Sequence, residues 1–92
     1  MTLELVCPAG TLPALRAAVD NGADSVYIGF RGATNARNFP GLNFDASEAA
    51  AGVAYAHERG ARVFVALNIY PSPATWETAT DTIDRAARLG VD

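Results

Sequence analysis

Apolar and polar positions divide the chain into short apolar runs and longer stretches with helical spacing. Three runs of β-branched and aliphatic residues predict strands at about Leu3–Cys7, Ser25–Gly29 and Val63–Asn68. None of them alternates strictly, which is typical of parallel strands covered by helices. Between and after them, apolar residues recur three and four positions apart, as on one face of a helix. We therefore expect strand and helix to alternate three times.

Local signals mark where the three helices begin. The first helix should start near Thr11, with Pro13 in its first turn. Asp45 can cap the second helix, with Glu48 three residues later to complete a capping box. Ser72 followed by Pro73 predicts the start of the third helix, because proline is tolerated in a first turn. On the third helix we expect one buried stripe: Trp76, Ala79, Ile83, Ala86 and Ala87.

Each helical segment ends in a glycine that is followed by the next apolar run. Gly22, Gly60 and Gly90 can each take the left-handed conformation that ends a helix. Val91 then reads as the beginning of a fourth strand. Strand–helix–strand units of this size form right-handed crossovers between parallel strands.

Two architectures fit this order: a (β/α)8 barrel and a doubly wound open sheet. The turn after the first strand, "CPAGTLPA", lacks the G-x-G-x-x-G pattern of dinucleotide-binding sheets. We therefore expect an α/β fold made of the N-terminal three β/α units of a (β/α)8 TIM-like barrel. Such a barrel takes about 250 residues, so residues 1–92 would be the N-terminal part of one domain whose remainder is absent. The alternative is a complete small three-layer domain.

Alternation within the strands sorts their side chains into two faces. The residues expected to face the helices are Leu3, Leu5, Val26, Ile28, Val63, Val65 and Leu67. The residues expected to face inward are Glu4, Val6, Tyr27, Phe64, Ala66 and Asn68. Ligands of such folds bind at the carboxyl ends of the strands. The loops at that end are Pro8–Thr11, Phe30–Phe44 and Ile69–Ser72.

The segment "TNARNFPGLNF", residues 34–44, belongs to the longest of these loops, which exceeds the usual strand–helix connection. Arg31 and Arg37 supply planar donors for a carboxylate, a phosphate or a polarised oxygen. Asn35 and Asn43, with Asn38, can bond either to a ligand or to the loop's own backbone. The alternative is a self-bonded loop in which the asparagines occupy turns and Arg37 forms a structural ion pair.

Three other side chains, those of Asn68, Tyr70 and Glu4, could have either a role in the site or an ordinary structural role. Asn68 and Tyr70 follow the third strand and could form a wall of the site or a turn. If Glu4 faces inward, it needs a partner, which Arg37 or another inward-facing residue could supply. The alternative is a structural ion pair near the lower rim. No residue can be assigned a catalytic role from these patterns.

For the two remaining candidates, His57 and Cys7, the sequence favours a structural role. His57 lies in the last turn of the second helix, at the end away from the ligand-binding edge, where it complements the helix C-terminus. Cys7 could line the site, but a lone cysteine is more often a small buried apolar residue. With no second ligand at metal spacing, this chain cannot build a zinc or iron–sulfur site by itself.

Composition and charge restrict the possible functions and locations of the protein further. The net charge is −3 and every basic residue is arginine, so no basic face for nucleic acid is indicated. The single cysteine excludes an internal disulfide. The N-terminus lacks the pattern of a signal peptide and no apolar run could span a membrane, so we expect a cytoplasmic protein.

The stretch "ELVCPAGTLPALRAAVDNGADSVYIGF" resembles the opening of the collagenase-like peptidase family U-32. The loop "TNARNFPGLNF" and the following "ALNIY" resemble its UbiU-type, ubiquinone-biosynthesis branch. That resemblance implies oxygen-independent hydroxylation of the ubiquinone ring by a heterodimer with a UbiV-type protein. It also implies 4Fe–4S clusters held by a region outside these residues, and a quinone precursor as substrate.

Applied to this chain, the resemblance implies a component of a hydroxylase complex that is inactive as a fragment. The substrate-binding candidates are Asn35, Arg37, Asn43, Asn68 and Tyr70. Two other functions stay open within the family, a peptidase and an RNA-base hydroxylation protein, and a non-catalytic half-barrel is a third. No proteolytic triad or G-x-S-x-G pattern supports the peptidase.

Overall fold

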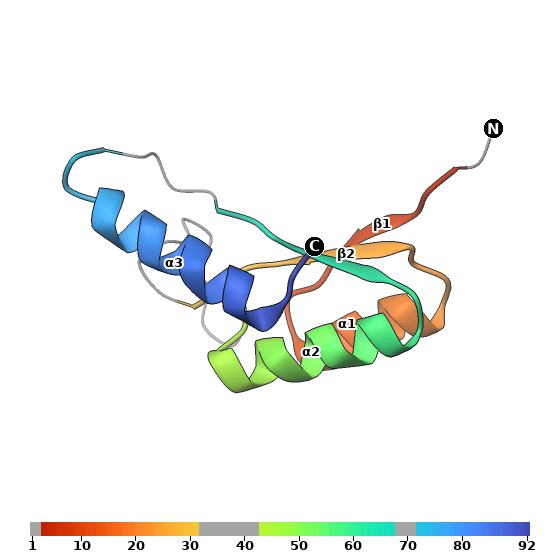
Figure 1. The fold of residues 1–92 in the computed structure, drawn as a ribbon. Helices are drawn as coiled ribbons and strands as arrows, with labels where there is room; N and C mark the ends of the chain where they lie inside the picture. Colours follow the sequence, from red (N-terminus) through yellow and green to blue (C-terminus); the bar gives the residue numbers. More distant parts are fainter. Residues whose placement is uncertain (1–2, 32–42, 68–71) are drawn as a thin grey trace.

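The computed structural model describes residues 3–31, 43–67 and 72–92, in which strands and helices alternate. The elements are β1 (Val6–Pro8), α1 (Leu12–Asp20), β2 (Ser25–Ile28), α2 (Ala46–Glu58), β3 (Arg62–Val65) and α3 (Trp76–Leu89). The strands form one parallel sheet in the order β1-β2-β3, and α1 and α2 lie along the same side of it (Figure 1). The predicted α/β alternation is confirmed; closure into a barrel stays a prediction.

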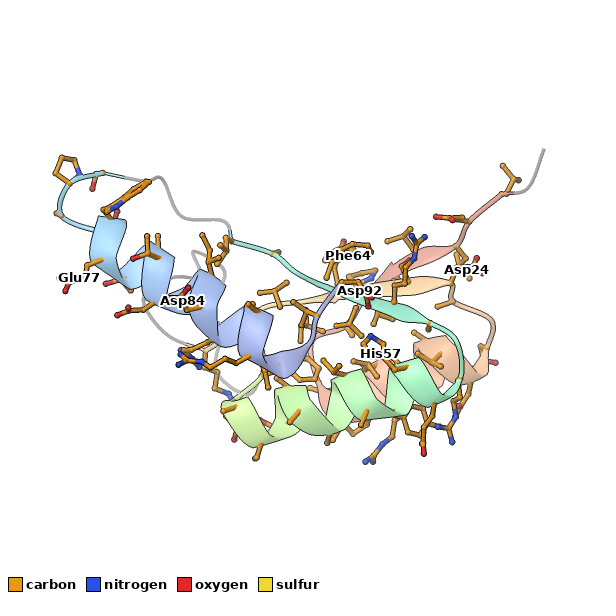
Figure 2. The ribbon with its side chains drawn as sticks, in the orientation of Figure 1. Asp24, His57, Phe64, Glu77, Asp84 and Asp92 are labelled. Atoms are coloured by element: carbon orange, nitrogen blue, oxygen red, sulfur yellow. The ribbon has the colours of Figure 1, made fainter. Side chains whose placement is uncertain are left out.

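The register of the sheet separates a covered face from an open one. Val26 lies opposite Val63, and both are fully buried on the side of the helices. Tyr27 lies opposite Pro8 on one side and Phe64 on the other. Tyr27 and Phe64 are 42% and 40% exposed, and Phe64 lies on the side away from α1 and α2 (Figure 2). For these residues the predicted alternation is confirmed.

The core lies between the sheet and the first two helices. Its largest fully buried hydrophobic side chains are Phe30, Phe44, Leu15, Ile28, Val26 and Val63. Gly52 brings α2 close to α1, because a Cβ added there would lie 2.9 Å from Leu15 Cδ1. This close approach explains why a glycine is found inside a helix, where it would otherwise be unfavourable.

The predicted starts of the first two helices are confirmed. The Thr11 side chain accepts a hydrogen bond from the Ala14 N–H, and Asp45 and Glu48 form a complete capping box. Each cap provides partners for backbone N–H groups that the first turn of a helix leaves unpaired. The predicted glycines also have positive φ angles, 101° at Gly22 and 78° at both Gly60 and Gly90.

Two aspartates, each two residues after a glycine of positive φ, make the same pair of contacts with a neighbouring strand segment. Asp24 accepts the Leu5 N–H at Oδ2 (2.8 Å) and donates its own N–H to the Leu5 carbonyl (2.9 Å). Asp92 does the same with Val63, at 2.9 and 2.8 Å. The backbone after α3 therefore lies beside β3, where a fourth strand is predicted to begin.

The first strand differs from its prediction at the amino end. β1 begins at Val6, and Leu3 and Leu5 are 85% and 50% exposed, although they were expected to face the helices. The chain before β1 extends away from α1 and α2 (Figure 1), so those side chains have no helix to pack against. The third strand is also shorter than predicted, since β3 ends at Val65 and Leu67 is 39% exposed.

The third helix begins later than predicted. Ser72 and Pro73 precede it in a turn, in which the Ser72 N–H bonds to Thr75 Oγ1 and the Thr75 N–H to the Ser72 carbonyl, both at 3.0 Å. This local pairing competes with helix formation, and α3 begins at Trp76 with Thr75 as its N-cap.

The predicted buried stripe of α3 is largely wrong. Trp76 and Ile83 are 62% and 52% exposed, Ala87 is exposed, and Ala79 and Ala86 are half-buried; the buried residue is Thr82. Ile83 instead lines an apolar groove of about 350 Å³ between α3 and β3. Helical spacing identified an apolar face, but burial depends on what packs against that face.

Candidate functional site

The carboxyl edge of the sheet is where the predicted site should lie, and backbone hydrogen bonds join its loops. The Ala9 N–H bonds to the Tyr27 carbonyl at 3.0 Å, which holds the end of β1 against β2. The Asn43 N–H bonds to the Gly10 carbonyl at 2.7 Å. The end of the long loop after β2 is therefore attached to the loop after β1.

Both ends of that long loop are fixed to the core by a pair of phenylalanines. Phe30 and Phe44 form an isolated parallel bridge and are 1% and 0% exposed. The Phe44 N–H bonds to the Gly29 carbonyl at 2.9 Å, and the Arg31 N–H bonds to the Phe44 carbonyl at 3.1 Å. The loop thus leaves and re-enters the fold at one place on the carboxyl edge.

Asn43 is the one predicted substrate contact that lies in the described residues. It has a φ of 73°, in the left-handed region that asparagine tolerates better than most residues, and it is 8% exposed. Its position at the edge agrees with the expected location. Its backbone conformation is one that asparagine adopts in turns, which agrees with the alternative of a self-bonded loop. Contact between Asn43 and a substrate therefore stays a prediction.

Arg31 contacts the start of α2. Its guanidinium lies 3.1 Å from Glu48 Oε1 and 3.6 Å from Asp45 Oδ2. The pKa of Asp45 is lowered, chiefly by the backbone N–H of Glu48, then by the Ser47 hydroxyl, with Arg31 adding a smaller contribution. Arg31 therefore neutralises the capping box, a structural role that the sequence analysis did not foresee.

Arg85 is an edge residue that the sequence analysis missed. It projects from α3, and its guanidinium carbon lies 5.0 Å from the centre of the Phe30 ring, within cation–π range. It therefore brings a positive charge to the carboxyl end of β2. No sequence signal could have found it, because the contact depends on how α3 packs beside the sheet.

The other predicted site residues lie outside the described residues: Asn35, Arg37, Asn38, Asn68 and Tyr70. Their roles remain predictions from sequence. The fixed positions of Arg31 and Asn43 show that the connection carrying Asn35 and Arg37 starts and ends at the carboxyl edge.

Glu4 forms the structural ion pair that was one of its two expected roles. Both of its carboxylate oxygens lie 3.0 Å from Arg62 Nη2, and both side chains are about half exposed. Arg62 is the first residue of β3, so the pair lies at the amino ends of the strands. Among the described residues the partner of Glu4 is thus Arg62, and the pair is far from the edge where ligands of such folds bind.

His57 also lies at the amino ends of the strands, as its structural interpretation requires. Its Nε2 is 2.7 Å from Asp92 Oδ2, and Figure 2 shows the two side chains pointing toward one another. The pKa of Asp92 is lowered, first by the Val63 N–H and then by His57. The contact fastens the backbone that follows α3 to α2.

This geometry predicts a pH-dependent contribution of Asp92 to stability. Because its folded-state pKa is below 3.8, the contribution is complete above pH 3.8 and is lost as the pH falls through the folded-state value. We expect the gap in free energy of unfolding between wild type and Asp92→Asn to shrink over that interval, as measured by urea unfolding at a series of pH values. Asp84→Asn, at an exposed position on α3, is the control; a gap that stays constant with pH would contradict the assignment.

The described residues do not fit an iron–sulfur cluster. Such clusters are held mainly by cysteine thiolates, and the chain has one cysteine. Cys7 is half-buried and packs against the hydrophobic core, which agrees with its apolar interpretation. Within residues 3–31, 43–67 and 72–92, no three His, Cys, Asp or Glu side chains are grouped so as to hold a metal ion. In the same ranges, no helix has the length and apolar character needed to cross a membrane.

The fold and the loops at the carboxyl edge of the sheet define a protein built from parallel β/α units. Proteins of this kind bind ligands at the carboxyl ends of their strands. The sequence model of peptidase family U32 matches residues 10–92. The chain therefore belongs to peptidase family U32.

Several curated proteins are similar to the chain. It is 33% identical over 90 residues to tRNA hydroxylation protein P of Helicobacter pylori, a match that covers 98% of this chain and 21% of that protein. It is 42% identical over 67 residues to tRNA hydroxylation protein P1 of Bacillus subtilis, covering 73% of this chain and 15% of the other. It is 37% identical over 90 residues to the 23S rRNA 5-hydroxycytidine synthase of Escherichia coli, covering 98% and 13%.

These relatives are much longer than the chain, which spans about a fifth or less of their length. No solved structure matches it. The comparisons therefore establish the family, and the activity of a whole protein containing these residues is a matter for proposal.

Proposed function

We propose that residues 1–92 are the N-terminal part of a TIM-like barrel in a UbiU-type protein that takes part in oxygen-independent hydroxylation of the ubiquinone ring. The observation that carries this proposal is the "TNARNFPGLNF" loop, which resembles the ubiquinone-biosynthesis branch and ends at the carboxyl edge through Asn43 and Phe44. In this proposal Asn35, Arg37 and Asn43 shape the substrate side of the site, with Asn68 and Tyr70 beside them.

The proposal includes a UbiV-type partner and 4Fe–4S clusters whose ligands come from outside residues 1–92. The resemblance implies that Cys7 is not one of those ligands, and its half-buried side chain packs against the core. The contribution of this chain is therefore to bind and orient the quinone precursor at the carboxyl edge, in a complex that acts in the cytoplasm.

The formal net charge of −3 supports a quinone over a polyanionic substrate. Among the described arginines, Arg31, Arg59 and Arg62 pair with carboxylates of this chain, whereas Arg85 brings its positive charge to the Phe30 ring at the carboxyl edge. Protein surfaces that bind nucleic acid present unpaired basic residues to the phosphates. A neutral, prenylated ring needs no such surface.

Hydroxylation of an RNA base is the second candidate. It is favoured by the relatives whose names state tRNA or rRNA hydroxylation. Both candidates share one chemistry, the addition of a hydroxyl group to a planar ring, and they differ in the substrate that carries the ring. A comparison of the two products in the same cells therefore distinguishes them.

The test is a deletion of the full-length gene, followed by growth without oxygen. We expect ubiquinone to fall to a small fraction of its normal level, and to return when the wild-type gene is restored. Arg37→Gln should restore it poorly, whereas Arg16→Gln, an exposed arginine on α1, should restore it fully. Normal quinone in the deletion strain, with loss of a hydroxylated nucleoside detected by mass spectrometry of its RNA, would overturn the proposal in favour of the second candidate.

A further inference from the structure

We draw no further inference here: the strongest candidate, the apolar groove between α3 and β3 lined by Val65, Leu67 and Ile83, lies where the next β/α unit of the proposed barrel would pack, and nothing in the part of the chain that the structure describes shows what covers it.

Discussion

Replacing Phe44 with alanine is expected to lower the free energy of unfolding by about 3–5 kcal/mol. Phe44 is fully buried, and its ring packs against α2, with Cε2 3.6 Å from where a Cβ on Gly52 would lie. Alanine would leave a large cavity between the loop end and the helices, and the surrounding structure could collapse into it only in part. Urea unfolding measures the loss, and Phe44→Leu, which keeps most of the volume, should lose considerably less.

The same substitution tests whether the core fixes the carboxyl edge. The Arg31 N–H donates to the Phe44 carbonyl at 3.1 Å, so it should exchange with solvent faster once the Phe44 side chain no longer holds the backbone in place. Hydrogen exchange of Arg31 in Phe44→Ala and in wild type gives the comparison. An unchanged exchange rate, or a stability loss within about 0.5 kcal/mol, would show that the loop end is held by something else.

Features that depend on a few neighbouring residues could be predicted from the sequence. The Asp45 and Glu48 capping box spans four residues, and both of its hydrogen bonds are present. The positive φ angles of Gly22 and Gly90 follow from the same kind of local signal, a glycine directly after a helix. Local geometry and local hydrogen bonds set these outcomes before any tertiary contact is made.

Features that depend on register or on packing partners could not be predicted. Glu4 was expected to need a partner, but its pairing with Arg62 follows from the alignment of β3 with the start of the chain, which spacing alone does not give. The exposure of Trp76 and Ile83 has the same origin, because an amphipathic pattern shows which side of a helix is apolar and not what covers it.

The candidate site contains one feature that could be predicted from the sequence and one that could not. The position of Asn43 at the carboxyl edge follows from strand order and could be expected. The ion pairs that Arg31 makes with Glu48 and Asp45 could not, because they depend on where the start of α2 lies relative to the end of β2. A charge that looked available for a ligand is used to stabilise a helix start.

Replacing Gly52 with valine is expected to lower the free energy of unfolding by about 1–3 kcal/mol through overpacking. A Cβ at this position would already lie 2.9 Å from Leu15 Cδ1 and 3.6 Å from Leu12 Cδ1, so the two further methyl groups must push α1 away from α2. Ala51→Val introduces the same side chain at an exposed position of the same helix and should cost no more than about 0.5 kcal/mol.

A double-mutant cycle with Leu15→Ala separates crowding from any other effect of the valine. Leu15 is fully buried, so Leu15→Ala alone should cost about 2–5 kcal/mol by leaving a cavity. In Gly52→Val/Leu15→Ala the valine enters that cavity, and the double variant should be more stable than the sum of the two losses predicts, by about 0.5–3 kcal/mol. Strict additivity in urea unfolding would mean that the two helices do not meet through this pair, because two side chains that compete for one volume cannot contribute independently to stability.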